Sequence, residues 1–520
     1  MPILSNKQAI ALALFSGILM GFAPAPINAW YLAWVALVPL WILIRAQKSL
    51  SKIIILGLVW GVGYDGLALF WITGIHPMTW MGVPWLASLL IAIFCWIFIT
   101  LWGAGVIISW SLIWGLINQK ITNKNIPSCL IRVLIGVGLW CGLETLWSHT
   151  PLWWPAIAYT QSPNNLIILQ LIKISGVNTV AALIIAVNGL LAEAIIYCQN
   201  ISQVRSKLLL LFSPLILLIT SHLIGYYLYQ IPLAKDNLSP LKIGIIQGNI
   251  PNEIKLYSAG WQKAIAGYTL GYQRLARQGV DAVLTPEGAL PFYWEDIIDN
   301  SSFYQTVKKE QVTVWVGANG RKGKSYTNSL FTLTGEGETY SRYDKHKLVP
   351  LGEYIPFESI LGKIIDRLSP LEAHLAPGKP NQIFDTPFGR AIVAICYESA
   401  FPQNFLYQAQ KGGNFIITVA NNAHYSKTMP SQNHAHDVMR AIESDRWAAR
   451  AANTGYSAII DPHGNTHWLS QLDQYAIHRT TIYRRQNKTL YVQWGDWLTP
   501  ILLIFSGIIG LIVIISPQRT

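Results

Sequence analysis

The chain has little charge. Only 12% of its 520 residues are Asp, Glu, Lys or Arg, about half the share found in an average soluble domain, while 52% are hydrophobic. This composition excludes an ordinary soluble enzyme. It also excludes a disordered chain, which would be rich in charge and poor in aromatic residues. The 22 tryptophans and the low charge instead indicate that a lipid bilayer forms part of the solvent.

Acidic residues are almost missing from the first 230 positions. Only Asp65, Glu144 and Glu193 occur there, whereas nearly all the remaining charge falls between Lys242 and Lys488. The chain therefore divides into a membranous part and a soluble part. We expect membrane helices in 1–230, a soluble catalytic domain in 231–490, and a last membrane helix with a short tail in 491–520.

Apolar runs near the length that spans a bilayer, about 17 to 25 residues, recur through the membranous part. They lie near residues 8–24, 30–45, 54–75, 85–117, 130–147, 177–198, 207–228 and 496–515. We therefore expect an α-helical transmembrane bundle of eight helices, seven before the soluble domain and one after it. A cleaved signal peptide is the alternative for the first run, but the six runs behind it favour a retained anchor.

Positive side chains cluster in alternate loops. Because Lys and Arg are retained on the cytoplasmic side of a membrane, these loops predict the orientation of the chain. The residues concerned are Arg45, Lys48, Lys52, Lys120, Lys124, Arg132, Arg205, Lys207 and Arg519. Both termini should then be cytoplasmic, with the soluble domain outside the cytoplasm. The same loops, together with anionic lipid heads, largely explain the net charge of +12, so we do not expect nucleic acid as a partner.

Cysteine is scarce. Four of the five cysteines lie in or beside membrane runs, and only Cys396 belongs to the soluble domain. A lone thiol cannot form a disulfide within that domain. In an oxidising compartment such a residue is either buried and inert or kept as a reactive group, and its position alone does not decide between the two.

The soluble segment alternates short β-branched runs with amphipathic stretches, as an α/β domain does. The expected strands are 241–246, 281–284, 312–316, 391–395 and 414–419, and the expected helices are 258–277, 402–411 and 434–453. Several of these strands end directly in polar residues. Functional groups at strand ends are typical of α/β folds.

Three polar clusters follow such runs. Glu287 stands in Thr-Pro-Glu-Gly, Lys345 opens a stretch that reaches Glu353, and Cys396 is followed by Tyr397 and Glu398. Taken singly, each has a structural explanation: a helix cap, a surface cation and a core thiol. The joint order of Glu, Lys and Cys at strand ends resembles the nitrilase superfamily, whose fold is an αββα sandwich.

A longer motif narrows the resemblance. The stretch Tyr-x-Lys-x-x-Leu-Val-Pro-x-Gly-Glu-Tyr-x-Pro runs from Tyr343 to Pro356, and Gln-Gly-Asn-Ile-Pro from Gln247 to Pro251. Together with a nitrilase-like domain between seven membrane helices and a final one, these motifs resemble the apolipoprotein N-acyltransferases. The resemblance implies a multi-pass protein of the bacterial inner membrane with its catalytic domain on the periplasmic face.

The resemblance also implies substrates and partners. The family transfers a fatty acyl chain from a membrane phospholipid to the α-amino group of the S-diacylglyceryl cysteine that begins an apolipoprotein. Phospholipid, apolipoprotein and the bilayer are thus the expected partners, and no cofactor is expected. A membrane-tethered amidase of the nitrilase type, with water in the second half-reaction, is the alternative function.

The implied chemistry assigns a role to each cluster. Cys396 would be the nucleophile that carries the acyl group as a thioester, and Glu287 the general base, with a pKa that we expect a desolvated pocket to raise. Lys345 would stabilise the oxyanion. Glu353 would orient Lys345 or the surroundings of the nucleophile, while Tyr397 and Glu398 would shape the pocket beside Cys396.

Two segments raise further questions. The family's Ser-Asn-Asp-Ala-Trp-Phe-Gly is replaced here by Ala-Asn-Asn-Ala-His-Tyr-Ser over 420–426, and its Trp after the Gln-Gly-Asn-Ile-Pro element by Leu256. Residues 354–375 are either ordinary core or a lid over the site. His434 and His436 lack partners at metal-ligand spacing, so we expect a polar helix face there and no metal site.

Overall fold

The computed structural model describes residues 4–122, 125–200, 204–233, 240–323, 325–350, 352–354, 375–423 and 425–515. The chain folds as two compact units. The first, here called the helical unit, comprises Met1–Thr73, Ile93–Ile231 and Trp494–Thr520, and the second, the sheet unit, comprises Gly74–Ala92 and Pro232–Gln493. The predicted lid, at 354–375, lies almost wholly outside the described residues.

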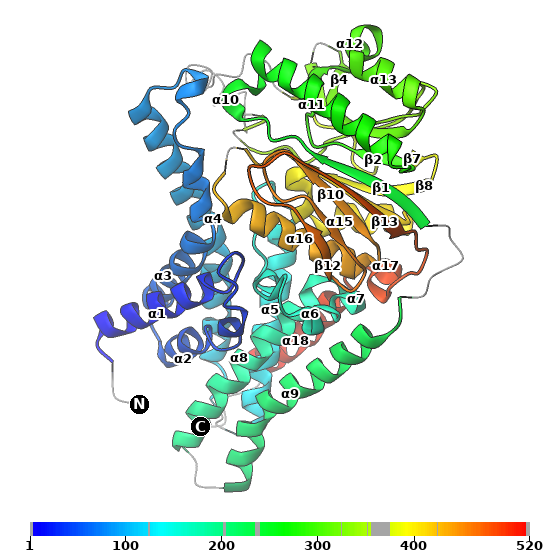
Figure 1. The fold of residues 1–520 in the computed structure, drawn as a ribbon. Helices are drawn as coiled ribbons and strands as arrows, with labels where there is room; N and C mark the ends of the chain where they lie inside the picture. Colours follow the sequence, from blue (N-terminus) through cyan, green and yellow to red (C-terminus); the bar gives the residue numbers. More distant parts are fainter. Residues whose placement is uncertain are drawn as a thin grey trace. The chain divides into compact units, whose positions relative to one another are not determined.

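The helical unit is built from long apolar helices (Figure 1). They are α1 (Asn6–Gly21), α2 (Val38–Ala46), α3 (Leu50–Ala68), α4 (Trp85–Asn118, counted here from Ile93), α5 (Ile126–Ser148), α8 (Val177–Asn200), α9 (Val204–Gln230) and α18 (Leu498–Ile515), with the short α6 (Leu166–Leu169) and α7 (Ile172–Ser175). Each predicted apolar run contains a helix. Within the described residues, five helices are long and apolar enough to cross a membrane, while Trp30–Ala46, Leu166–Ser175 and Leu498–Val513 form shorter apolar helices.

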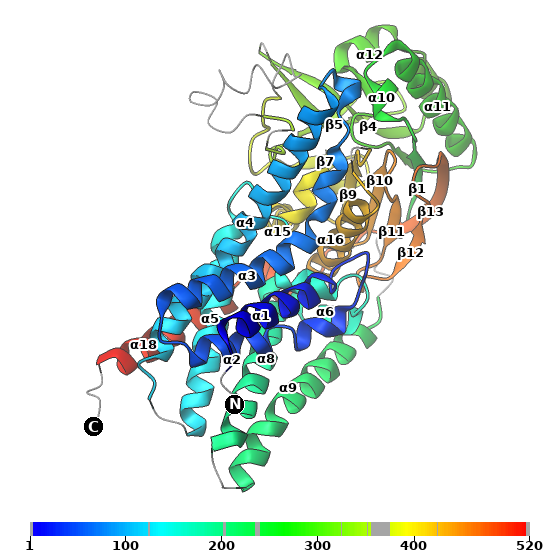
Figure 2. The ribbon, with the colours of Figure 1, turned by 90° about the vertical axis from the view of Figure 1, so that its left-hand side faces the viewer.

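Helices α1 and α3 lie side by side in close contact, as Figure 2 shows. Glycines on both helices make the approach possible. A Cβ on Gly17 would lie 2.2 Å from the carbonyl oxygen of Trp60, and one on Gly63 would lie 2.8 Å from that of Leu14. Small residues at such crossings let two backbones approach closely, which is how helices associate where lipid removes the hydrophobic drive.

Two buried acidic residues of the helical unit, Glu193 and Glu144, accept hydrogen bonds. Glu193 pairs with Arg45, lies 3.7 Å from the Nη1 of Arg132, and accepts a hydrogen bond from the Nε1 of Trp41 at 3.1 Å. Glu144 accepts the backbone N–H of Ile157 at 2.8 Å. These contacts offset part of the cost of placing charge in an apolar bundle.

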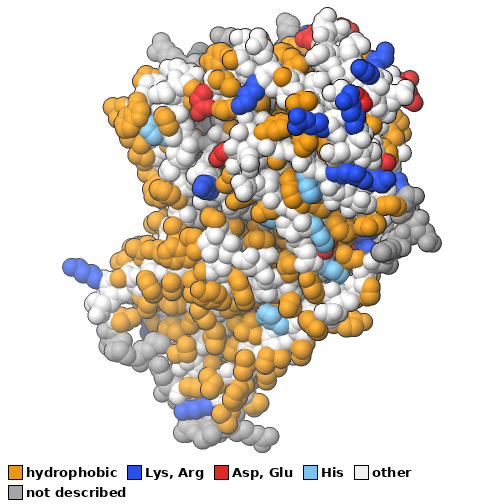
Figure 3. All heavy atoms as spheres, in the orientation of Figure 1, with side chains coloured by type: hydrophobic (Ala, Val, Ile, Leu, Met, Phe, Trp, Pro, Cys, Tyr) orange, Lys and Arg blue, Asp and Glu red, His pale blue; other side chains and the backbone are white. Residues whose placement is uncertain are grey.

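Helix α9 carries many exposed apolar side chains, among them Phe212, Ile216 and Leu223. Figure 3 shows hydrophobic side chains covering most of the visible surface of the helical unit, whereas Lys, Arg, Asp and Glu gather on the sheet unit. An apolar surface of this extent is unfavourable in water. It fits a unit that is surrounded by lipid.

The sheet unit contains two sheets. The strands are β1 (Pro240–Gln247), β2 (Ala282–Leu284), β3 (Leu290–Tyr293), β4 (Thr313–Lys322), β5 (Ser325–Leu333), β6 (Thr339–Asp344), β7 (Phe384–Thr386), β8 (Gly389–Ile395), β9 (Phe415–Ala420), β10 (Ala448–Ala452), β11 (Ala458–Ile460), β12 (Thr466–Leu469) and β13 (Ala476–Tyr483). The first sheet runs β13-β1-β2-β4-β5-β6, with β3 paired to β4, and the second runs β12-β11-β10-β9-β8-β7.

Helices cover the outer face of each sheet (Figure 1). The helices of this part of the chain are α10 (Asn252–Lys255), α11 (Ser258–Arg277), α12 (Trp294–Asn300), α13 (Ser302–Glu310), α15 (Pro402–Gln410), α16 (Thr428–Ser444) and α17 (Leu490–Trp494). Helix α11 packs on β1 and β2, α15 on β8, and α16 on β11. Between the sheets, the ring of Trp315 on β4 contacts that of Phe415 on β9, with centroids 5.9 Å apart. The unit is therefore an α/β sandwich of four layers.

The predicted strands and helices of this unit are confirmed except at one place. The helix expected at 434–453 ends at Ser444, and Ala448–Ala452 forms strand β10 instead. Its run of alanines with one arginine favours a helix by intrinsic propensity. Parallel pairing with β9, from Ala448 opposite Ile416 to Ala452 opposite Ala420, overrides that preference.

Gly317 on β4 supplies a test of this packing. A Cβ there would lie 2.0 Å from the carbonyl oxygen of Pro286, in the turn that follows β2. We expect Gly317→Ala to destabilise the unit by about 1–3 kcal/mol, because the turn must move, and to lower the unfolding temperature measured in detergent. Gly267→Ala, on helix α11, is the matched control. Its new Cβ would lie 3.6 Å from the ring of Tyr475, an ordinary contact, so stability should hold or rise.

Candidate active site

Glu287 sits on the turn that follows β2. The turn is held to β4, since Thr285 donates its N–H to the carbonyl oxygen of Trp315 at 3.0 Å and its Oγ1 accepts the N–H of Gly317 at 3.2 Å. Gly288 closes the turn with a φ of +53°, a conformation that glycine adopts without strain. These bonds place a carboxylate that is only 6% exposed.

Lys345 follows β6 and lies between two carboxylates. Its Nζ is 3.0 Å from Oε1 of Glu287 and 2.7 Å from Oε1 of Glu353. The lysine is 1% exposed, so its charge is removed from water and depends on this pairing. Glu353 thus contacts Lys345 directly. We call Glu287, Lys345 and Glu353 the charged triad.

The carboxylates of the triad are themselves held in place. Glu287 accepts the side-chain amide of Asn328 at 2.6 Å through Oε1 and the backbone N–H of Asn421 at 2.7 Å through Oε2. Glu353 accepts the N–H of Val349 at 2.8 Å. Such hydrogen bonds favour the ionised form and restrict the rotamer of each carboxylate.

The charges of the triad determine its protonation. Burial by itself would raise the pKa of Glu287, but Lys345 and Lys255 and the N–H of Asn421 outweigh it, so this pKa lies below its usual value. The prediction of a raised pKa was wrong, because pairing with a cation outweighs desolvation. Burial also opposes the charge of Lys345, yet Glu287 and Glu353 raise its pKa well above normal. Burial and the charge of Glu287 raise the pKa of Glu353.

Cys396 stands at the end of β8 and opens a short 3-10 helix, η5 (Cys396–Ala400). Its φ of +55° lies in the left-handed region, which is costly for a residue with a Cβ and is typical of functional sites. Burial and the charge of Glu287 raise the pKa of the thiol to about 12, and the charge of Lys345 opposes them. The thiol therefore lies within the field of the triad and is protonated at neutral pH.

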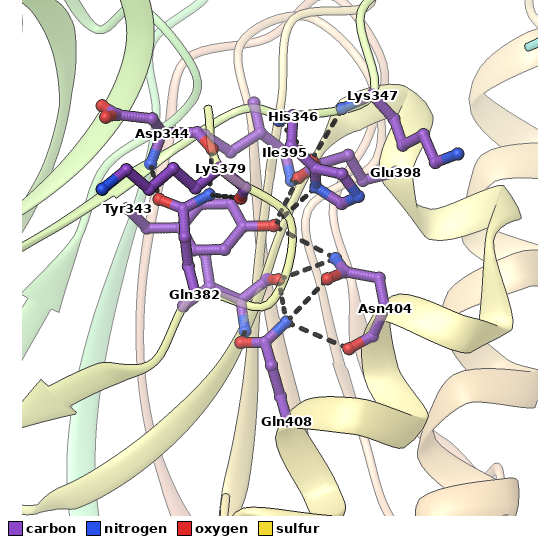
Figure 4. A network of polar contacts seen from close by, with 11 residues as sticks. Tyr343, Asp344, His346, Lys347, Lys379, Gln382, Ile395, Glu398, Asn404 and Gln408 are labelled. Carbon is purple, nitrogen blue, oxygen red and sulfur yellow. Dashed lines mark hydrogen bonds and ion pairs between the residues drawn. The ribbon is translucent and has the colours of Figure 1, made fainter. Parts of the chain in front are cut away.

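Glu398, two residues after Cys396, points toward the segment that carries Lys345 (Figure 4). It is completely buried, and its two oxygens together accept five hydrogen bonds. The donors are the N–H of Ile395 at 2.8 Å, the hydroxyl of Tyr343 at 3.1 Å, the N–H groups of His346 at 2.8 Å and Lys347 at 3.2 Å, and the Nδ1 of His346 at 2.7 Å. Glu398 thus connects the turn that carries Cys396 to the segment that carries Lys345.

Two tyrosines, Tyr397 and Tyr425, lie near the thiol of Cys396. Tyr397 is half-buried, with its ring 5.1 Å from that of Phe401. Burial and the charge of Cys396 both raise the pKa of Tyr425, which places this tyrosine of the altered 420–426 segment in the field of the thiol. His424, beside it, lies outside the described residues.

The site contains residues that sequence analysis missed. Asn328 lies on β5, where nothing in the pattern separates it from any polar residue of an alternating strand. Lys255 lies on α10, where its Nζ comes within 3.4 Å of the carbonyl oxygen of Glu287. Its position four residues after the Gln-Gly-Asn-Ile-Pro element was the available signal.

His434 and His436 are more buried than the sequence predicted. His434 and His436 were predicted to lie on a polar helix face, but both are buried on α16. Burial lowers the pKa of His434 to about 4, and its Nε2 lies 3.1 Å from Oγ1 of Thr466. Among the described residues, no group of three or more His, Cys, Asp or Glu side chains is placed to hold a metal ion.

Comparison with known proteins agrees with this arrangement. Residues 242–482 match the family model "Carbon-nitrogen hydrolase", and residues 16–190 match "Apolipoprotein N-acyltransferase N-terminal domain". The sheet unit is thus a nitrilase-like α/β enzyme domain of the carbon–nitrogen hydrolase class. A solved amidase from Nesterenkonia sp. is 16% identical, with a TM-score of 0.37 over 52% of this chain and 97% of its own.

Two relatives carry the comparison to the level of a family. An apolipoprotein N-acyltransferase from Nostoc sp. is 55% identical over 94% of this chain and 96% of its own length. The protein of the same name from Synechocystis sp. is 49% identical over 96% of this chain and 99% of its own. The chain belongs to the apolipoprotein N-acyltransferase family.

The contacts of Glu398 lead to a prediction about stability and pH. Glu398→Gln removes a charged acceptor, so we expect a loss of about 1–3 kcal/mol of folding free energy and slower turnover, because the segment that carries Lys345 is held less firmly through Tyr343 and His346. Burial would raise the pKa of Glu398, but the hydrogen bond and charge of His346 lower it. The stabilisation is therefore complete above the ordinary carboxyl pKa and disappears as the pH falls through the lower, folded value.

Unfolding temperatures measured from pH 7 downward check this prediction. The gap between wild type and Glu398→Gln should shrink below a pH of about 4.3. Glu336→Gln, at an exposed turn of the same unit, is the control and should leave the unfolding temperature unchanged. A gap of constant size across the whole pH range would show that the charge of Glu398 does not stabilise the fold.

Proposed function

We propose that this chain N-acylates apolipoproteins in two half-reactions that pass through a thioester on Cys396. The observation that carries the proposal is a buried charged triad beside a buried, strained thiol, in a chain of the apolipoprotein N-acyltransferase family. The catalytic residues of the proposal are Cys396, Glu287 and Lys345, and Glu353 is a positioning residue.

In the first half-reaction, the sulfur of Cys396 attacks the ester carbonyl of a membrane phospholipid. Glu287 accepts the thiol proton as the carbon–sulfur bond forms, because the thiol, with a pKa of about 12, does not ionise beforehand. The ammonium of Lys345 stabilises the oxyanion. The intermediate then expels the lysophospholipid alkoxide, which takes the proton from Glu287, and the acyl group remains on sulfur.

In the second half-reaction, the α-amino group of the S-diacylglyceryl cysteine attacks the thioester. Glu287, again ionised, accepts a proton from the attacking nitrogen, and the sulfur leaves as the amide forms. That proton returns to the sulfur, which restores the resting thiol. A low pKa suits Glu287, since a general base must be unprotonated when each nucleophile arrives.

The proposal includes a place in the cell. We propose eight helices across the bacterial inner membrane, both termini in the cytoplasm and the sheet unit on the periplasmic face. The alternate loops rich in Lys and Arg support this orientation. The exposed apolar side chains of α9 and α18 support contact with lipid, and a phospholipid donor is then present at high local concentration.

Intact-mass measurement tests the thioester. Purified protein incubated with phospholipid vesicles should gain one fatty-acyl increment that neutral hydroxylamine removes, and a diacylglyceryl-cysteinyl peptide should discharge it. Cys396→Ala should gain none, because no other described thiol lies beside the triad. Cys198→Ala, which removes a half-buried thiol of the helical unit, should behave as wild type.

Each other result has a meaning. An acyl increment retained in Cys396→Ala would contradict the thioester route. An increment that decays in water whether or not peptide is present would favour the amidase-type hydrolase over the transferase.

Glu353 gives a second test of the mechanism. Glu353→Gln keeps the shape of the side chain but removes one of the two charges that position Lys345. We expect the single-turnover rate of Cys396 acylation to fall about 10- to 100-fold, in proportion to the loss of a charge-assisted hydrogen bond, and to fall further in Lys345→Met. An unchanged rate in Glu353→Gln would remove Glu353 from the mechanism.

A further inference from the structure

Lys255 is a second lysine beside Glu287. Its Nζ lies 3.4 Å from the backbone oxygen of Glu287, and a Cβ built on Gly288 would lie 3.4 Å from the same nitrogen. The ammonium is thus on the turn that carries the general base. The charges of Glu287 and Cys396 both act on it.

The two active-site lysines differ in their partners. Lys345 is neutralised by two carboxylates, whereas in the described part of the chain Lys255 forms no ion pair and donates to one carbonyl oxygen. An ammonium has three donors, so two remain for a ligand. Burial lowers the pKa of Lys255 to about 8, with Glu287 and Cys396 opposing, so the amine is mostly charged at neutral pH.

The residues after Lys255 are apolar and exposed. Leu256 is 60% exposed, Tyr257 54% and Trp261 38%. A free cation next to exposed apolar side chains complements a molecule that is anionic at one point and apolar beside it. A phospholipid has this pattern, because an anionic phosphate lies next to apolar acyl chains. Its ester carbonyl is only a few bonds from the phosphate, so both can lie in one site.

We propose that Lys255 binds the phosphate of the phospholipid donor while its ester carbonyl lies at Cys396. The inference rests on the proposed function, because it assigns a binding group to the donor of that reaction. Lys345, which lies between the carboxylates of Glu287 and Glu353, stabilises the oxyanion of the intermediate. Lys255 binds the phosphate, which is charged throughout the reaction. One lysine therefore stabilises the transition state and the other binds the substrate.

The test compares two donors with the same acyl chains, phosphatidylglycerol and the corresponding diacylglycerol, presented in the same mixed micelles. The measured quantity is the ratio of their kcat/KM values for acylation of Cys396, followed by intact mass. We expect Lys255→Met to lower this ratio about 10- to 100-fold, mainly through the KM of phosphatidylglycerol. Lys263→Met, at an exposed lysine of α11, is the matched control and should keep the wild-type ratio.

The pH dependence separates charge from shape. In wild type the ratio should fall as the pH rises through about 8, where Lys255 loses its proton. Lys255→Arg should restore the ratio at neutral pH and hold it above pH 8, because a guanidinium stays charged. The groups that act on this titration are Glu287 and Cys396.

Three results would overturn the proposal. Equal losses of kcat/KM with both donors, which leave the ratio unchanged, would place Lys255 in the chemical step. Wild-type kcat/KM values with both donors in Lys255→Met would remove it from donor binding. If wild-type Cys396 accepted an acyl group from neither donor, the proposed function itself would fail. In that case native mass spectrometry of Cys396→Ala still decides on Lys255: phosphatidylglycerol retained equally with and without Lys255→Met would contradict the phosphate site.

Discussion

The active site depends on one buried ammonium. Lys345 is 1% exposed and stays charged only because Glu287 and Glu353 lie within 3.0 Å of it. Removing three charges from water is costly, and the cost is offset only when each group is fully bonded. The backbone N–H groups of Asn421 and Val349 complete that bonding. The loops that carry Asn421 and Val349 are therefore held in place by hydrogen bonds to the triad.

The remainder of the sheet unit fixes the triad relative to the thiol. Glu398 bonds the turn of Cys396 to the segment after β6. Asn453 does the same across the two sheets, because its side chain bonds both the N–H and the oxygen of Ile250 and also Asn421. Both residues hold loops that come from distant parts of the sequence. Such a frame holds the geometry of the candidate site.

The helical unit must pack its helices and bury charge in an apolar surrounding. Its glycines allow helices to approach where lipid supplies no hydrophobic drive, and Glu193 is paired inside the bundle with Arg45 and Arg132. The outer faces of α9 and α18 are left apolar. In each unit a buried carboxylate is paired with a cation, Glu193 with Arg45 and Glu287 with Lys345.

The sequence by itself determined the two-part organisation and most strands and helices of the α/β domain, and it led to the proposal of Glu287, Lys345, Glu353 and Cys396 as site residues, because hydrophobic length, periodicity and motif order are local properties. Only the tertiary structure decided the rest. It made 448–452 a strand through pairing with β9, lowered the pKa of Glu287 through contact with a cation, and brought Asn328 and Lys255 to the site. These outcomes depend on distances between residues far apart in the chain, which no local pattern encodes.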